Sequence, residues 1–198
     1  MDAGRADAGR ILQTLRALDF VESACLTGSF SRGCADRYSD IDIALAPRNM
    51  APDEALLRSC EALKREHEVR WLDFAPSLMP QKYVASLFFA GTGNPFRYVD
   101  IALMGDGRVT CPPEAFANDP AVHLVKLWLM NFKHGLRGSE GFQADFARML
   151  RRAGVEEHGG TLDGFKAVLD GLDGAIDGRV LSLLRKTLEE HADKGVFR

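Results

Sequence analysis

The chain has 198 residues, a formal net charge of −3 at pH 7, and no long run of basic residues. This length suits one domain, or a small α/β domain with a helical extension. Extended nucleic acid is a poor partner, because its phosphates bind clustered lysine and arginine side chains. Residues 1–10 lack the apolar core of a signal peptide, and no apolar stretch is long enough to span a membrane. We therefore expect a cytoplasmic protein without a membrane partner.

Helices and strands are predicted to alternate in the first half of the chain. Apolar residues recur at helical spacing over residues 7–18 and predict an amphipathic helix. A proline followed by two acidic residues is typical of a helix start and predicts a helix over 52–66. Short apolar runs predict five strands, the last two of which form a hairpin, over 21–27, 40–46, 68–74, 84–90 and 97–104.

The second half of the chain is predicted to be wholly helical. Asp119-Pro120 is typical of a helix start, and the helix that follows over 120–134 is apolar around most of its circumference. The best domain boundary is the proline-rich segment 111–113. The predicted fold class is therefore α+β, with a small mixed sheet and flanking helices over 1–111 and a helical domain over 112–198. The other predicted helices cover 141–153, 161–172 and 176–192.

Residues 28–42 carry the strongest functional signal. Gly28 and Ser29 follow an apolar strand, and Asp40 and Asp42 open the next one. The two aspartates point to the same face of that strand, and such a repulsive pair is costly unless a cation or a proton compensates the charge. Oxygen ligands without cysteine or histidine suit Mg²⁺, which commonly also binds substrate phosphates. Because glycine leaves room for a phosphate and serine offers a hydroxyl, this stretch predicts a metal–nucleoside triphosphate site.

The sequences Leu-Thr-Gly-Ser at 26–29 and Ser-Asp-Ile-Asp at 39–42 together resemble a known family. They are similar to the nucleotidyltransferase superfamily that includes DNA polymerase β and kanamycin nucleotidyltransferase, and most of all to its small bacterial branch. The resemblance implies the sheet of the nucleotidyltransferase fold and a site for one or two Mg²⁺ ions. It also implies that Asp40 and Asp42 bind the metal and that the triphosphate is held by Gly28, Ser29, Arg32 and Ser39.

The family carries a third carboxylate on a later strand, and two residues here are candidates for it. Asp100 and Asp73 each lie in a β-rich run between apolar neighbours. In aminoglycoside and lincosamide nucleotidyltransferases the third acid comes just after a hairpin turn, which favours Asp100. Asp100 is then expected to bind the metal or to accept the proton of the acceptor hydroxyl. Asp73 remains the alternative.

Lys126, Lys133 and Arg137 are spaced seven and four residues apart on the predicted helix that begins at residue 120. They would share one face if the helix continues that far. One interpretation is that these side chains form a solvent-exposed stripe, with their charged ends in water and their aliphatic parts covering the edge of the core. The other is a cationic wall that binds the triphosphate, in which Lys126 and Lys133 contact the nucleotide.

The resemblance implies transfer of a nucleoside monophosphate from a nucleoside triphosphate, with ATP the expected donor, to a hydroxyl group. The expected acceptor is a small molecule such as an aminoglycoside-like antibiotic, so that the activity would confer antibiotic resistance. One alternative is an antitoxin-type enzyme that modifies a partner protein. Another is a degenerate module that only binds nucleotide. A homodimer also remains open.

Overall fold

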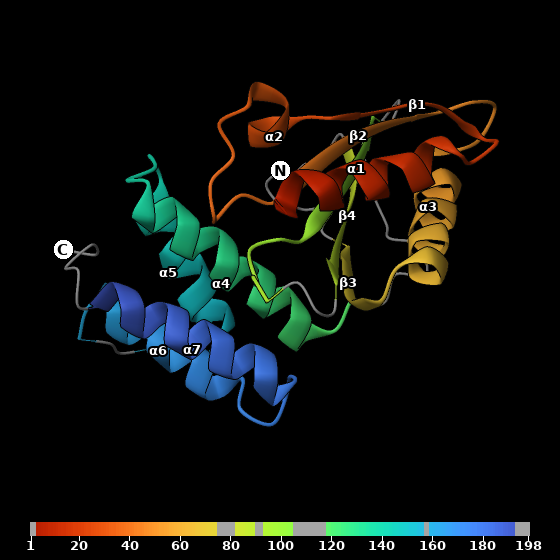
Figure 1. Ribbon diagram of the computed structural model, residues 1–198. Coiled ribbons are helices and arrows are strands. Elements are labelled where there is room, and N and C mark those ends of the chain that lie inside the picture. Colours follow the sequence, from red (N-terminus) through yellow and green to blue (C-terminus); the bar gives the residue numbers. More distant parts are fainter. Residues whose placement is uncertain (1–2, 75–81, 90–92, 105–117, 157–158, 193–198) are drawn as a thin grey trace. The chain divides into compact units, whose positions relative to one another are not determined.

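Figure 1 shows the computed structural model, which describes residues 3–74, 82–89, 93–104, 118–156 and 159–192. The chain divides into two compact units, Met1–Asn118 and Asp119–Arg198. The predicted boundary at 111–113 lies outside the described residues, so the division into 1–111 and 112–198 stays a prediction. Within the described ranges, no helix combines the length and the apolar character needed to cross a membrane.

The first unit is built on a five-stranded mixed sheet with the order β1-β2-β5-β4-β3. Three pairs of neighbours are antiparallel, whereas β2 and β5 run parallel. All five predicted strands and the hairpin of the last two are confirmed. The strands are β1 (Val21–Leu26), β2 (Ile41–Pro47), β3 (Val69–Phe74), β4 (Lys82–Phe89) and β5 (Val99–Met104).

Two helices, α1 (Ala3–Arg16) and α3 (Pro52–Glu66), pack on one face of this sheet. Leu15 of α1 and Leu56 of α3 share a buried cluster with alternate residues of β2 and β5. Each such aliphatic side chain contributes about 1.5–3 kcal/mol on burial. Because side chains alternate between the two faces of a strand, the residues between the core positions point to the opposite face. The core residues concerned are 41, 43 and 45 of β2 and 99, 101 and 103 of β5.

Cys60 lies on the buried side of α3, whereas Cys25 and Cys34 are exposed. Burial raises the pKa of the Cys60 thiol from 9.0 to about 12. Since only the thiolate reacts, we expect a maleimide at pH 8 to label Cys25 and Cys34 in the native protein and Cys60 only after unfolding. Mass spectrometry of the labelled peptides measures each site separately. Equal labelling rates for Cys60 and Cys25 in the native protein would contradict this burial.

The second unit is helical, which confirms the predicted helical C-terminal region. The side chain of Asp119 accepts a hydrogen bond from the Ala121 backbone N–H at 2.8 Å and caps the first helix. Inside the unit, the indole Nε1 of Trp128 donates to the carbonyl of Phe165 at 3.0 Å. The helices are α4 (Pro120–Leu136), α5 (Phe142–Arg152), α6 (Thr161–Gly171) and α7 (Gly178–Ala192).

Candidate active site

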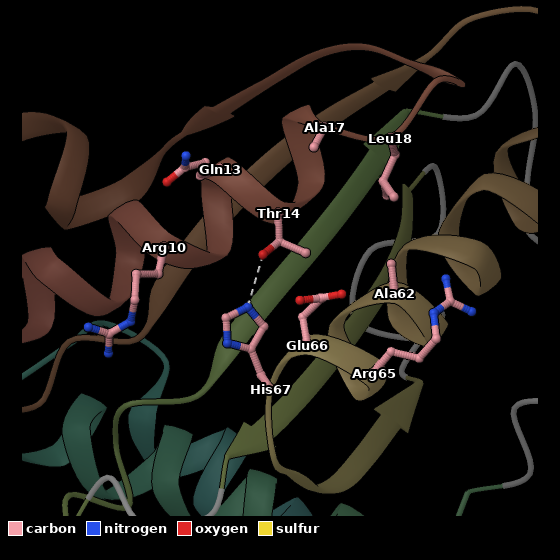
Figure 2. Close-up of a pocket in the computed structure, with 9 residues that line it drawn as sticks. All are labelled: Arg10, Gln13, Thr14, Ala17, Leu18, Ala62, Arg65, Glu66 and His67. Carbon is pink, nitrogen blue, oxygen red and sulfur yellow. Dashed lines mark hydrogen bonds between the residues drawn. The ribbon is translucent and has the colours of Figure 1, made fainter.

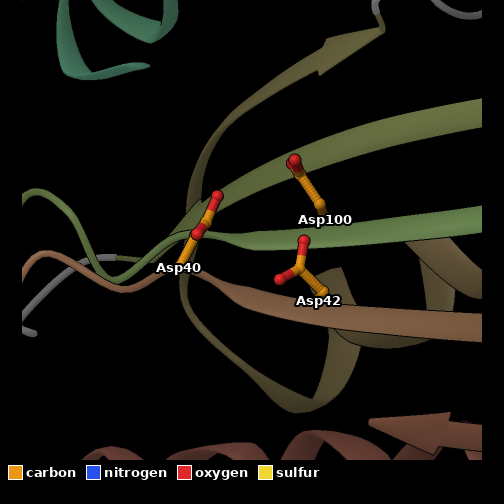
Figure 3. Close-up of side chains that lie close together, drawn as sticks. All are labelled: Asp40, Asp42 and Asp100. Carbon is orange, nitrogen blue, oxygen red and sulfur yellow. The ribbon is translucent and has the colours of Figure 1, made fainter. Parts of the chain in front are cut away.

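Three carboxylates converge on the face of the sheet opposite α1 and α3. Asp42 on β2 and Asp100 on β5 are direct neighbours in the parallel register, and Asp40 immediately precedes β2. One oxygen from each of these residues lies within 4.8 Å of the others (Figure 3). All three side chains are partly exposed. This donor set consists of oxygen atoms alone and fits a hard divalent cation such as Mg²⁺.

The structure distinguishes the two candidates for the third acid. Asp100 joins Asp40 and Asp42, whereas Asp73 pairs in register with Ser86, which in turn pairs with Asp100. Asp73 thus shares the acidic face but lies two strands from Asp100, or about 10 Å. Its side chain is fully buried. Asp100 is therefore the third member of the acidic cluster.

Replacing Asp100 with asparagine should weaken Mn²⁺ binding by at least about 30-fold, within the range reached when a metal site loses a supporting group. Asp73→Asn makes the same change of charge but removes no oxygen from the cluster, so its Mn²⁺ affinity should stay close to that of the original protein. Electron paramagnetic resonance of free Mn²⁺ measures both affinities. Thermal unfolding in EDTA shows whether each variant is folded. A larger loss of affinity for Asp73→Asn than for Asp100→Asn would reverse the assignment.

The Gly-Ser turn lies directly against the acidic cluster. The backbone N–H of Thr27 donates to the carbonyl of Asp42 at 2.8 Å, which brings the turn to β2. Gly28 has a φ of 60°, and a Cβ atom at this position would collide with the carboxylate of Asp42. Glycine is therefore required both by the backbone conformation and by the space beside the acid. Ser29 follows it in the turn.

The Gly-Ser turn opens a short helix, α2 (Gly28–Arg32). Phe30 is buried and belongs to the hydrophobic core, so it fixes α2 against the sheet. The signal for this helix was a single large apolar residue in a stretch of small polar ones. Arg32 is exposed at the end of α2, and its contact with the nucleotide stays a prediction.

The loop that leads to Asp40 is fixed by internal hydrogen bonds. Ser39 is 1% exposed, and its hydroxyl donates to the carboxylate of Asp36 at 2.8 Å while accepting from the Asp36 backbone N–H at 2.9 Å. The side chain of Asn94 also donates to the carbonyl of Arg37 at 2.8 Å. These contacts give Ser39 a role in holding the loop. Its contact with the nucleotide stays a prediction.

Tyr98 is a residue near the acids that the sequence analysis missed. It is 1% exposed, and burial raises the pKa of its hydroxyl well above the ordinary value. The negative charges of Asp40, Asp100 and Asp42 raise that pKa further, so the phenol stays protonated. The available signal was its position two residues before Asp100, immediately ahead of β5.

Lys126 and Lys133 lie on α4 in the second unit and are 1% and 7% exposed. The prediction of a solvated stripe is therefore wrong for these two lysines, although Arg137 is exposed. A buried ammonium group requires polar or charged partners, and both residues have interactions within the structure. Their contact with the nucleotide stays a prediction.

A separate pocket of about 500 Å³ lies between α1 and the end of α3 (Figure 2). His67 and Thr14 form a hydrogen bond of 3.1 Å between its walls. Partial burial lowers the pKa of His67, and the charge of Arg10 lowers it further, so the imidazole is neutral at pH 7. Since α1 and α3 cover the face of the sheet opposite the acids, this pocket is not part of the acidic cluster.

Comparisons with known proteins gave one family match and several similar solved structures. Residues 9–82 match the nucleotidyltransferase domain family. One similar solved structure is Cid1, described as having RNA terminal uridylyl transferase activity, with 19% identity, a TM-score of 0.36, and coverage of 83% of this chain and 44% of that one. Another is the polymerase core of TRAMP, an RNA surveillance complex, with 13% identity, a TM-score of 0.37, and coverage of 85% and 56%.

The chain spans about half the length of these two solved structures, 44% of one and 56% of the other. No curated protein sequence matches it. The matched segment 9–82 includes the Gly-Ser turn and two of the three clustered acids. The chain therefore carries a segment, residues 9–82, that matches the nucleotidyltransferase domain family.

Proposed function

We propose that the chain transfers a nucleoside monophosphate from ATP, or a related nucleoside triphosphate, to a hydroxyl of a small molecule in a Mg²⁺-dependent reaction. The observation that carries most weight is the convergence of Asp40, Asp42 and Asp100 within 4.8 Å. Their carboxylates are the ligand type that Mg²⁺ prefers. The absence of a side chain at Gly28 lets the carboxylate of Asp42 lie directly against the Gly-Ser turn. These residues fit a metal–nucleotide complex.

In the proposed reaction, the oxygen of the acceptor hydroxyl bonds to the α-phosphorus. The bond from that phosphorus to the pyrophosphate oxygen breaks, and pyrophosphate leaves. Asp40, Asp42 and Asp100 would hold one or two Mg²⁺ ions, which would neutralise charge on the phosphates. Asp100 is also the proposed acceptor of the hydroxyl proton. The proposed contacts of the triphosphate are Gly28, Ser29, Arg32, Ser39, Lys126 and Lys133.

The proposed acceptor is a small hydroxylated molecule, with aminoglycoside-like antibiotics as the first class to test. A net charge of −3 and the lack of a long basic run argue against an extended nucleic acid. A side chain of a partner protein is the second candidate. It is supported by the Gly-Ser-x-x-Arg-Gly pattern at 28–33, which is similar to antitoxin-type nucleotidyltransferases. A homodimer is compatible with either acceptor.

The test is incubation with α-labelled ATP or another triphosphate, Mg²⁺, and a panel of aminoglycosides, lincosamides, copurifying proteins and a short RNA. We expect a labelled small molecule and released pyrophosphate, both dependent on Mg²⁺ and both lost in Asp40→Ala. Label on a protein would support the second candidate. Label on the RNA would overturn the proposed acceptor but keep the transfer reaction. If no triphosphate is bound or consumed, and Asp40→Ala changes nothing, the proposed function is wrong.

A further inference from the structure

Ser86 on β4 lies between two acids on the face of the sheet that carries the acidic cluster. The strand register pairs it with Asp100 on one side and with Asp73 on the other. Asp100 is in turn paired with Asp42. Adjacent strands are about 4.8 Å apart, so neighbouring side chains in this row are within reach of one another. We call the set the polar row; it runs across β2, β5, β4 and β3 and consists of Asp42, Asp100, Ser86 and Asp73.

The hydroxyl of Ser86 donates a hydrogen bond to Oδ1 of Asp100. Ser86 is 0% exposed, so bulk water does not compete for this contact. A carboxylate has two oxygen atoms that can each accept hydrogen bonds or bind a metal. A fixed donor on one of them limits rotation of the whole carboxylate. The orientation of Asp100 toward Asp40 and Asp42 therefore depends on a residue outside the acidic cluster.

We propose that Ser86 is a positioning residue of the metal site, which acts by holding the carboxylate of Asp100 in the orientation that binds the ion. This inference rests on the proposed function, since it assigns Asp100 to a metal. Hydrogen-bond partners of metal ligands orient those ligands, and their loss typically weakens metal binding by about 10- to 100-fold. Ser86 needs no contact with the nucleotide or the acceptor to have this effect.

Ser59 offers a matched control within the same unit. It is also a serine with 0% exposure, but it lies on α3, on the other face of the sheet. Its hydroxyl has no hydrogen-bond partner among the described residues. Ser59→Ala therefore removes the same atom from an equally buried position without changing the polar row. Any effect of a generally perturbed core should occur in both alanine variants.

The experiment is titration of the full chain with Mn²⁺ alone, followed by electron paramagnetic resonance of the free ion. We expect Ser86→Ala to weaken Mn²⁺ binding by about 10-fold or more. Ser86→Thr retains the hydroxyl and should recover affinity to within about threefold, while Ser59→Ala should bind like the original protein. Thermal unfolding in EDTA reports folding without metal. If Ser86→Ala does not fold, Ser86→Cys replaces it, since it fills a similar volume with a much weaker donor.

Unchanged Mn²⁺ affinity in Ser86→Ala would overturn the positioning role, and so would equal losses in Ser86→Ala and Ser59→Ala. Failure of Ser86→Thr to recover affinity would also overturn it, because the hydroxyl is then not the group that matters. Asp42→Asn in the same titration separates this inference from the proposed function. If Asp42→Asn loses Mn²⁺ binding and Ser86→Ala does not, only the positioning role is wrong. If Asp42→Asn binds Mn²⁺ normally, the proposed metal site itself is wrong.

Discussion

Replacing Asp42 with asparagine is expected to abolish nucleotide transfer and, at the same time, to make the metal-free protein more stable. Asparagine has nearly the same shape as aspartate but lacks the negative charge. A bound metal supplies several kcal/mol of stabilisation to the transition state. Since each 1.36 kcal/mol corresponds to a factor of ten, loss of a metal ligand should reduce kcat on the order of 10³-fold or more.

The gain in stability follows from repulsion within the acidic cluster. Three carboxylates whose oxygens lie within 4.8 Å of one another repel when no cation is bound. For partly exposed charges at this separation, removing one of them should stabilise the fold by about 1–2 kcal/mol, using a dielectric constant close to that of water, about 80. We therefore expect Tm in EDTA to rise by about 2–6 °C. Added Mg²⁺ should stabilise the original protein but not the variant.

The measurements are pyrophosphate release and thermal unfolding, the latter with Mg²⁺ and with EDTA. Asp19→Asn is the control, because it makes the same change of charge at an exposed position in the turn before β1. It should alter neither activity nor the response to Mg²⁺. A lower Tm for Asp42→Asn in EDTA would show that Asp42 stabilises the fold rather than the metal. Retained transfer activity in this variant would overturn the proposed chemistry.

The local part of the site was predictable from the sequence because it depends on short-range rules. Asp40 and Asp42 are two residues apart at a strand start, and this spacing alone places them on one face. Proline and two acids at 52–54 marked the start of α3, and the predicted bounds agree with Pro52–Glu66. The strands were likewise visible as short apolar runs. All of these signals lie within a few residues of one another.

The rest of the site depends on long-range strand pairing, which no local pattern specifies. Asp100 meets Asp42 only because β2 pairs in parallel with β5, although α3, β3 and β4 lie between them in the chain. From the residues alone, Asp73 had the same apolar neighbourhood as Asp100. The resemblance to hairpin-containing enzymes favoured Asp100, which is the one that clusters with Asp40 and Asp42. Ser86 has no sequence signal at all, since its role comes from the register of β4 against β5. The burial of Lys126 likewise depends on tertiary packing.

Replacing Gly28 with alanine is expected to destroy the metal site through a single methyl group. The position has a φ of 60°, where an L-residue costs about 1–2 kcal/mol. The new Cβ would also collide with the carboxylate of Asp42. The backbone N–H of Thr27 donates a hydrogen bond to the carbonyl of Asp42, so the Gly-Ser turn cannot easily move away from β2. The carboxylate of Asp42 must then rotate out of the acidic cluster. We expect loss of Mn²⁺ binding and of nucleotide transfer, together with a lower Tm.

Gly93→Ala separates the two causes, because Gly93 also has a φ of 60° but a Cβ there would meet none of the described residues within 4 Å. Both variants should lose about 1–2 kcal/mol of stability from the backbone conformation. Only Gly28→Ala should lose Mn²⁺ binding. Titration with Mn²⁺ measures the affinity of each variant, and chemical unfolding measures its stability. Equal Mn²⁺ affinities would mean that Asp42 tolerates the methyl group and that Gly28 serves only the backbone conformation. Loss of Mn²⁺ binding in Gly28→Ala alone would show that the metal site requires a residue without a side chain beside Asp42.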